Sequence, residues 1–131
     1  MQSRVKKLVL LLLAVLAAAA VVLWMLYDRQ DVFQGEQVKT SDEYTLEFTK
    51  MNQTDSHVLS LQADDELLVE IRARKGTVDL SIGMDGKDPV YRGNRLSGGG
   101  FQVAILEAGD YRVTVKARHA EGRISVIRDA R

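Results

Sequence analysis

The pattern of hydrophobic and polar positions divides the chain into one continuous apolar run and a long region of alternating residues. The run covers residues 8–27, twenty residues without a charge. As a helix rising about 1.5 Å per residue, it would span roughly 30 Å, which is the thickness of the hydrocarbon core of a bilayer. The run therefore predicts one N-terminal transmembrane helix.

The residues that flank the run predict its orientation. Lys6 and Lys7 precede it, while Trp24 and Tyr27 lie near its far end. Basic residues favour the cytoplasmic side, and aromatic rings favour the headgroup level. We therefore expect residues 1–7 to form a cytoplasmic tail and the remainder to be extracytoplasmic.

Removal of the run as a signal peptide is the alternative to a retained anchor. Ala18 and Ala20 offer a small-x-small cleavage site, but seven apolar residues follow it directly. Such a site would lie within the apolar run, whereas a signal peptide has an apolar core of about 7–15 residues that ends before the site. We therefore expect an uncleaved signal anchor at residues 8–27.

From residue 43 onward, apolar and polar residues alternate with a period of two. This period is typical of strands with one buried face. The alternating runs cover residues 44–49, 67–74, 78–84, 101–105, 111–117 and 124–126, with shorter candidates at 57–61 and 89–92.

Short segments that favour turns separate these runs. They are Lys75-Gly76, Asp85-Gly86, 107–110 and 119–122, each with a glycine. Glycine readily supplies the positive φ of tight turns. The pattern predicts an antiparallel β-sandwich of about seven or eight strands.

The predicted sandwich covers residues 43–131. The polar segment 28–42 before it is predicted to be a linker, although Phe33 and Val38 could instead begin the fold.

Two stretches, KGTVDLSIGMDGKDPVYRGN (75–94) and FQVAILEAGDYRVTVKARHAEGRISV (101–126), carry a family resemblance. They resemble the jelly-roll-like sandwiches of bacterial pre-peptidase C-terminal domains, and also GOLD-type domains, over roughly residues 61–128. The resemblance implies a jelly-roll-like fold and an accessory or binding module rather than a catalytic one. It carries over no functional residue.

Charge argues against a nucleic-acid partner. The chain has 18 basic and 18 acidic residues, and without the three bases that precede the apolar run its net charge is −3. Nucleic-acid binding needs a concentrated basic face. Residues 28–70 carry a net charge of −8 and residues 71–131 carry +5. The two halves either interleave and mix their charges, or form two surfaces of opposite sign, one of which meets a partner or anionic lipid.

Few residues could support catalysis or bind a metal. The chain has no cysteine, and His57 and His119 are its only histidines, without metal-ligand spacing. Asp64–Glu66, with Asp85 and Asp88, could supply oxygens for calcium, but polar turns explain these acids equally well. We expect no enzyme activity, no cofactor and no metal.

The segment 91–100, YRGNRLSGGG, is the most suggestive candidate for ligand contact. Its candidate ligand-binding residues are Tyr91, Arg92, Asn94 and Arg95. Tyrosine and arginine can stack on a ring or pair with a carboxylate. The alternative is a flexible connection between sheets, whose glycines ease a bend.

Together these features predict a non-catalytic, membrane-tethered binding or accessory module at the bacterial cell surface. Its partner would be another membrane protein or an envelope polymer. The alternative is a small subunit that joins a larger membrane complex through its transmembrane helix, where Ala17–Ala20 would permit close approach of another helix.

Leucine in place of Ala17–Ala20 separates these two hypotheses. If the sandwich binds the partner, crosslinking of the partner in native membranes survives the replacement and is lost when residues 43–131 are deleted. The opposite pair of results would support assembly through the helix, because bulky side chains prevent close helix packing.

Overall fold

The structure is a computed structural model that describes residues 2–28 and 31–129, without the side chains of Tyr27 and Asp28. Some expectations lie outside the described residues. They concern the Tyr27 ring, Met1 of the tail, residues 29–30 of the linker and the last two residues of the sandwich. The chain forms two compact units, Met1–Gln30 and Asp31–Arg131, and each is described by itself.

The first unit is a single helix, α1, at Gln2–Asp28. Leucine and alanine dominate it, and no glycine or proline interrupts it. Its part Gln2–Leu26 contains an 18-residue window with a mean hydropathy of 3.0 and is long and apolar enough to cross a membrane, a test that a signal sequence also passes. The predicted apolar helix is confirmed, whereas its retention as an anchor stays a prediction.

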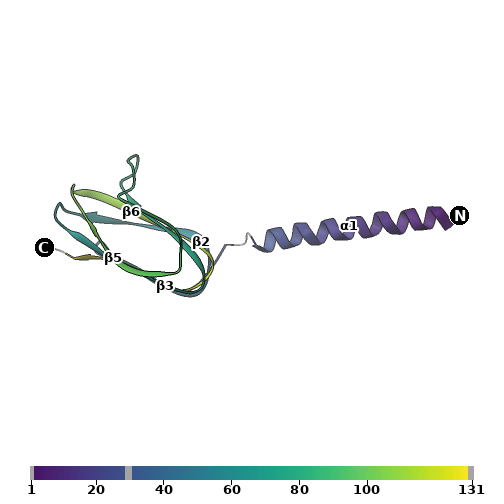
Figure 1. The fold of residues 1–131 in the computed structure, drawn as a ribbon, viewed down its shortest axis with the longest axis horizontal. Coiled ribbons are helices and arrows are strands. Elements are labelled where there is room, and N and C mark those ends of the chain that lie inside the picture. Colours follow the sequence, from purple (N-terminus) through teal and green to yellow (C-terminus); the bar gives the residue numbers. More distant parts are fainter. Residues whose placement is uncertain (1, 29–30, 130–131) are drawn as a thin grey trace. The chain divides into compact units, whose positions relative to one another are not determined.

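Within residues 31–129, the second unit contains six strands of one antiparallel sheet, so the predicted all-β sandwich fold is confirmed, with six strands in place of the seven or eight expected. The strands are β1 Val32–Lys39, β2 Glu43–Leu61, β3 Glu66–Gly83, β4 Tyr91–Leu96, β5 Gly98–Ala104 and β6 Gly109–Asp129 (Figure 1). Their order is β1-β2-β6-β3-β4, and β5 also pairs with β3.

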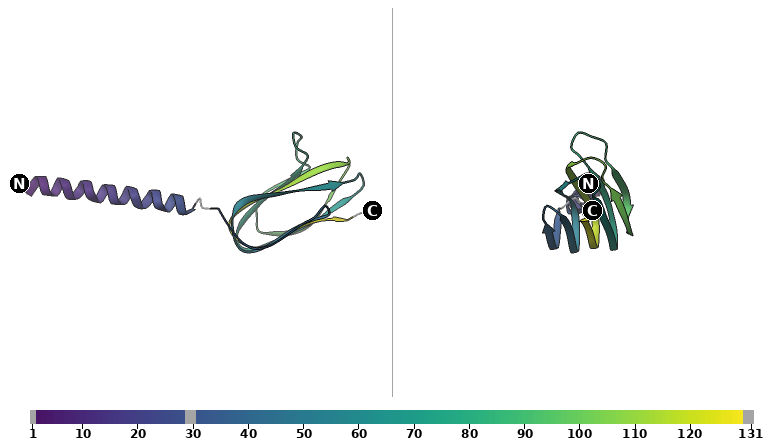
Figure 2. Two further views of the ribbon diagram at one scale, coloured as in Figure 1. Left: turned by 180° about the vertical axis from the view of Figure 1, so that it is seen from behind. Right: turned by 90° about the vertical axis from the view of Figure 1, so that its left-hand side faces the viewer.

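Three of the strands are long enough to bend and run through two layers. β2, β3 and β6 have 19, 18 and 21 residues, and the two views in Figure 2 show the sheet folded over on itself. One layer, here called the five-stranded layer, contains β1, β5 and one half of each long strand. The other, the four-stranded layer, contains β4 and the remaining halves.

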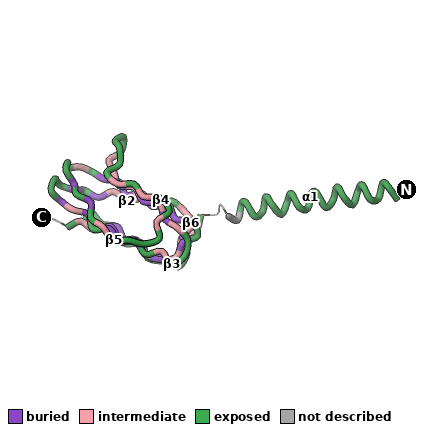
Figure 3. Tube along the Cα trace, in the orientation of Figure 1, coloured by how far each residue is buried: buried purple, intermediate pink, exposed green. Residues whose placement is uncertain are grey.

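The core lies between these layers and explains the alternating sequence pattern. In β3, for example, Leu67, Val69 and Ile71 are buried in the five-stranded layer, and Val78, Leu80 and Ile82 are buried in the four-stranded layer. Figure 3 shows buried positions recurring along the strands. Removal of this apolar surface from water is the main favourable contribution to folding.

Two of the predicted turns are bends within strands. Residues 75–76 lie inside β3 and residues 119–122 lie inside β6, whereas 85–86 and 107–110 do fall at strand connections. The register shifts between Ala73 and Thr77, where β3 pairs with β6. The same glycine that closes a hairpin also permits a bulge, which lets a long strand change layers.

Glycine is required at both bends. Gly76 has a φ of +71° and Gly122 a φ of +155°. A Cβ at Gly122 would fall on the carbonyl oxygen of Arg72, and one at Gly76 on the carbonyl oxygen of Arg118. The backbones of β3 and β6 therefore approach each other too closely at the bends for any side chain.

The prediction that residues 28–42 form a linker is wrong for most of that segment. Val32–Lys39 is strand β1, which pairs with β2 from Val32↔Asn52 to Lys39↔Tyr44. The ring of Phe33 packs against that of Phe48, with centroids 6.4 Å apart. Burial of Phe33 thus begins the fold, and only residues 29–31 separate α1 from β1.

Replacement of Gly122 by alanine should destabilise the sandwich by about 3 kcal/mol, because the new methyl group collides with backbone and the φ is strained. Gly98→Ala is the matched control, since its Cβ would meet only the Ile71 carbonyl oxygen at 3.7 Å. Thermal unfolding of the full chain in detergent, followed by the circular dichroism of the strands, measures both. Equal stability of the two variants would contradict the proposed role of the bend.

Candidate binding surface

The strands β4 and β5 follow one another along β3 and form the edge of both layers on that side. β4 pairs with the second half of β3, and β5 pairs with the first half. They meet at Ser97, whose carbonyl oxygen accepts a hydrogen bond of 2.8 Å from the N–H of Ala73. The segment 91–100, for which a flexible connection between sheets was one alternative, therefore contains edge strand β4 and the start of edge strand β5, which lie in different layers.

An open groove of about 940 Å³ lies along β5, which we call the β5 groove. It arises because Gly98 and Gly100 have no side chains where they pair with Arg72 and Glu70 of β3. Besides these residues, it is lined by Leu68, Val69, Ile71, Ala73, Arg74, Ser97, Gly99, Phe101, Gln102, Ser125 and Ile127.

The β5 groove combines an apolar floor with charged walls. Leu68, which is 38% exposed, pairs with Ile127 of β6 and with Gln102 of β5. Beside them Arg72 Nε lies 2.7 Å from Glu70 Oε1, and both side chains are exposed. The surface can therefore contact apolar groups and ionic groups of either sign.

The sequence of β5 leaves its outer edge without common protection against pairing. Gly98–Ala104 contains no charged residue and no proline. Edge strands usually carry charges, proline or bulges that discourage added strands. By contrast, β4 carries Arg92 and Arg95, and β1 carries Glu36, Lys39 and a bulge at Gln34/Gly35.

The four residues predicted to bind a ligand do not form one site. Tyr91 turns inward, where its ring packs 4.5 Å from the ring of Phe101 between centroids. Arg92 and Asn94 point outward from β4 and line a small depression of about 130 Å³ with Ser81 and Lys116. Their role in binding stays a prediction.

The fourth residue, Arg95, lies near the end of β4, just before the edge of the sheet passes to β5 in the other layer. Its φ is +53°, and its backbone N–H donates to Asp79 Oδ1 at 2.8 Å. Arg118 also binds Asp79, at 2.7 Å from Nη2 to Oδ2. The Arg118 guanidinium first, and then the Arg95 N–H, hold the pKa of Asp79 below its usual value. The local fold accounts for the backbone of Arg95.

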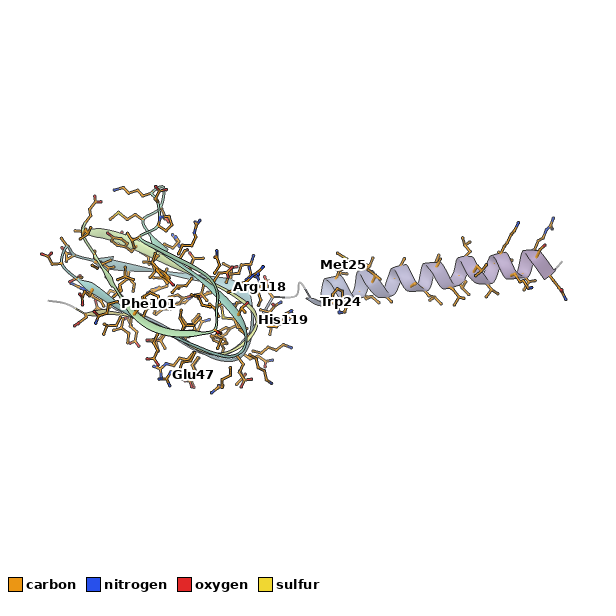
Figure 4. All side chains as sticks on the ribbon, viewed as in Figure 1. Trp24, Met25, Glu47, Phe101, Arg118 and His119 are labelled. Atoms are coloured by element: carbon orange, nitrogen blue, oxygen red, sulfur yellow. The ribbon has the colours of Figure 1, made fainter. Side chains whose placement is uncertain are left out.

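The two histidines belong to different surroundings. The ring of His57 lies 5.5 Å from the ring of Tyr44 between centroids and contacts the carbonyl oxygen of Thr40. Burial first, and then Asp55, which accepts a hydrogen bond from the Tyr44 hydroxyl, raise the pKa of Tyr44. His119 is exposed at the bend of β6 (Figure 4).

The acids considered as calcium ligands include two that form ion pairs. Asp65 Oδ2 lies 2.7 Å from Arg128 Nε, and Asp85 Oδ1 lies 3.0 Å from Arg112 Nε. The Gln62 N–H, ahead of Arg128, lowers the pKa of Asp65, and Arg112 lowers that of Asp85. Within residues 2–28 and 31–129, no group of three histidine, aspartate or glutamate side chains is arranged to hold a metal ion.

The three glycines of β5 are evident in the sequence, but the groove is not. The groove needs Leu68, Ile127 and Glu70 from other strands, and their meeting depends on the pairing of β3 with both β5 and β6. The available signal was the run Gly98–Gly100 next to an alternating strand, which also indicates close backbone approach.

Comparison with known proteins places the chain by fold alone. No protein-family model and no curated protein sequence matches it. It is similar in structure to the pre-peptidase C-terminal domain of a Bacillus anthracis collagenase, at 10% identity and a TM-score of 0.46, covering 77% of this chain and 98% of that one. A pre-peptidase C-terminal domain is thus among the solved structures that are similar to this chain.

Two further solved structures share the sandwich. The periplasmic g-type lysozyme inhibitor PliG of Aeromonas hydrophila is 16% identical with a TM-score of 0.40, covering 74% of this chain and 88% of that one. A carbohydrate-binding module of Cellvibrio mixtus lichenase 5A, solved with cellotriose, is 14% identical with a TM-score of 0.41, covering 80% and 93%. These likenesses describe the fold and assign no ligand.

Acid should destabilise the sandwich, because the carboxyl pKa values of Asp65, Asp79 and Asp85 are lower in the folded state. Stability from these groups is complete above the ordinary pKa of 3.8 and is lost as the pH falls through the lower folded values. We expect constant stability from pH 7 to 5 and a steep loss below about pH 4.

Asp79→Asn should lose about 1 kcal/mol at pH 7 and show a shallower loss in acid, because one of the responsible groups is gone. Asp64→Asn, which changes an exposed turn residue, is the control. Urea unfolding at a series of pH values measures the effect. An Asp79→Asn variant with the pH profile of the unchanged protein would refute the assignment.

Proposed function

We propose that the chain is a membrane-anchored, non-catalytic binding module on the outer side of a bacterial membrane, and that the β5 groove binds an extended segment of a partner protein. The observation that carries the proposal is an uncharged, glycine-rich edge strand beside a groove with an apolar floor. Anchoring rests on α1, whose apolar window has no buried residues and whose length suits a bilayer.

An added strand is the occupant that best suits β5. Among the described strands, β5 pairs only with β3, so its other edge presents backbone N–H and C=O groups to an incoming chain. Gly98 and Gly100 offer no side chain on the groove side that would obstruct it. Main-chain hydrogen bonds would supply affinity, and alternate side chains of the partner would supply specificity.

Side chains beside β5 would select the partner. An incoming strand would place alternate side chains over Gly98 and Gly100, in the direction of Leu68 and Ile127. Glu70 and Arg72 would pair with charges of either sign on that segment. An envelope glycan is the other occupant that the groove could accept, and the following experiment separates the two.

A photo-crosslinking residue at Gln102, in the full chain in native membranes, tests the proposal. We expect an adduct with one segment of one partner protein, identified by mass spectrometry of the crosslinked peptides. Gly98→Lys with Gly100→Lys should reduce the adduct at least tenfold, corresponding to about 1.4 kcal/mol, because charge and bulk then occupy the edge.

Arg92→Ala with Asn94→Ala is the matched control, since it changes exposed residues of the neighbouring edge strand β4. This control should leave the adduct unchanged. Three results would refute the proposal: an adduct with a glycan, an adduct that the two lysines do not affect, or loss of the adduct in the β4 control, which would favour the residues predicted from the sequence.

A further inference from the structure

The sandwich has two chemically different ends, defined by where its strands bend and where they turn. The bends of β2, β3 and β6 and the β4–β5 junction lie at one end, the bend end, made of residues 48–53, 73–77, 95–98 and 117–122. The strand connections and the last residues of β6 lie at the other, the loop end, made of residues 39–43, 62–66, 84–90, 105–110 and 128–129.

Charge is strongly divided between the two ends. The bend end has five basic residues and one acidic residue: Lys50, Arg74, Lys75, Arg95, Arg118 and Glu121. The loop end has ten acidic residues and three basic ones: Asp42, Glu43, Asp64, Asp65, Glu66, Asp85, Asp88, Glu107, Asp110, Asp129, Lys39, Lys87 and Arg128. The halves of the sequence do interleave in both layers, yet their charges separate along the strands.

The basic residues of the bend end are available to a partner surface. The side chains of Arg74 and Lys75 are 69% and 77% exposed, and each lies 3.6 Å from Glu121, their shared acidic neighbour. Such exposed pairs are weak, so they leave both basic side chains able to contact another surface. Arg118, labelled in Figure 4, is paired with Asp79 and adds less.

The chain enters the sandwich at this same end. Val32, the first residue of β1, pairs with Asn52 of the β2 bend. In the sequence, residues 29–31 alone separate α1 from β1. The connecting segment has a net charge of −1, from Asp28, Arg29 and Asp31, which reduces the positive charge near the bend end by one.

We infer that the bend end binds the anionic lipid headgroups of the leaflet through which α1 emerges, which orients the sandwich with its acidic loop end away from the membrane. The inference rests on the anchoring of α1 proposed above. A basic residue near an anionic surface is attracted to it, so several together can hold the sandwich against the leaflet. The anionic headgroups also repel the acidic loop end.

This orientation bears on the β5 groove. β5 begins at Gly98 in the bend end and finishes at Ala104, close to the loop end. With the bend end on the headgroups, the edge of β5 would run from the membrane outward. A partner strand added there would start near the bilayer, as the juxtamembrane segment of another membrane protein does.

Lipid-dependent quenching tests the inference with the full chain in vesicles. The chain lacks cysteine, so a single introduced cysteine directs a bimane label to one position. Thr49→Cys carries the label at the bend end, and Ala63→Cys carries it at the loop end. The vesicles contain either phosphatidylcholine only or 30% phosphatidylglycerol, with a nitroxide quencher on a headgroup. We expect stronger quenching at position 49 with the anionic lipid, reversal at 0.5 M salt, and little change at position 63.

Charge reversal provides the specific control. Lys50→Glu, Arg74→Glu and Lys75→Glu together should reduce the ratio of bound to unbound sandwich at least tenfold and remove the lipid dependence. The control variant reverses three charges outside the bend end: Lys87→Glu, Arg92→Glu and Lys116→Glu. It changes the net charge equally and should retain the lipid dependence of the quenching. Circular dichroism confirms that both variants are folded.

Flotation of the same vesicles separates the two proposals. Two results for a chain that floats with both lipids would refute binding of headgroups by the bend end and leave the anchor intact. One is quenching that does not depend on the lipid, and the other is the same quenching in both triple variants. A chain that floats with neither lipid would refute the anchor, and the inference with it.

Discussion

The close approach of β3 and β6 at their bends is the constraint on which the rest of the structure depends. Gly76 and Gly122 permit each strand to leave one layer and enter the other while still paired with its neighbour. Because the long strands contribute to both layers, the inner faces of a single sheet form most of the core, to which Ile105 of the β5–β6 connection adds. A side chain at Gly122 would force the strands apart where the layers join.

The bends also determine where the functional surfaces can lie. A sheet folded in this way places all its bends at one end and its turns at the other, so the two ends can differ in charge without conflict in the core. It also leaves β5 as an edge strand, beside outward-facing residues of β3 and β6. The candidate groove, the basic end and the entry of the chain are therefore consequences of one topology.

Much of the fold could be predicted from the sequence, because alternation directly reports which face of a strand is buried. Tyr44, Leu67 and Val113 were all on predicted inward faces and are buried. Turn chemistry was less informative: a glycine at 76 or 122 serves a bend as well as a hairpin. The polar segment around Phe33 has no clear alternation of apolar and polar residues, because β1 contacts the core through the ring of Phe33, which packs against Phe48.

The candidate site was predictable only in part. The segment 91–100 drew attention through its arginines and glycines, but alternation of β4 points Tyr91 inward and Arg92 outward. The groove beside Gly98 and Gly100 depends on strand pairing between residues some thirty positions apart, such as Arg72↔Gly98 and Glu70↔Gly100. A single sequence gives no direct information on such pairing.

Both proposals depend on α1 remaining attached to the sandwich, so the size and location of the mature protein are the most direct test. Intact-mass measurement of the protein after separation of membrane and soluble fractions should find the apolar run of residues 8–27 still attached to the sandwich, in a protein of the membrane fraction that only detergent releases. A mature protein shorter by about twenty residues, recovered in the soluble fraction, would contradict the account, because it would identify the apolar run as a cleaved signal peptide.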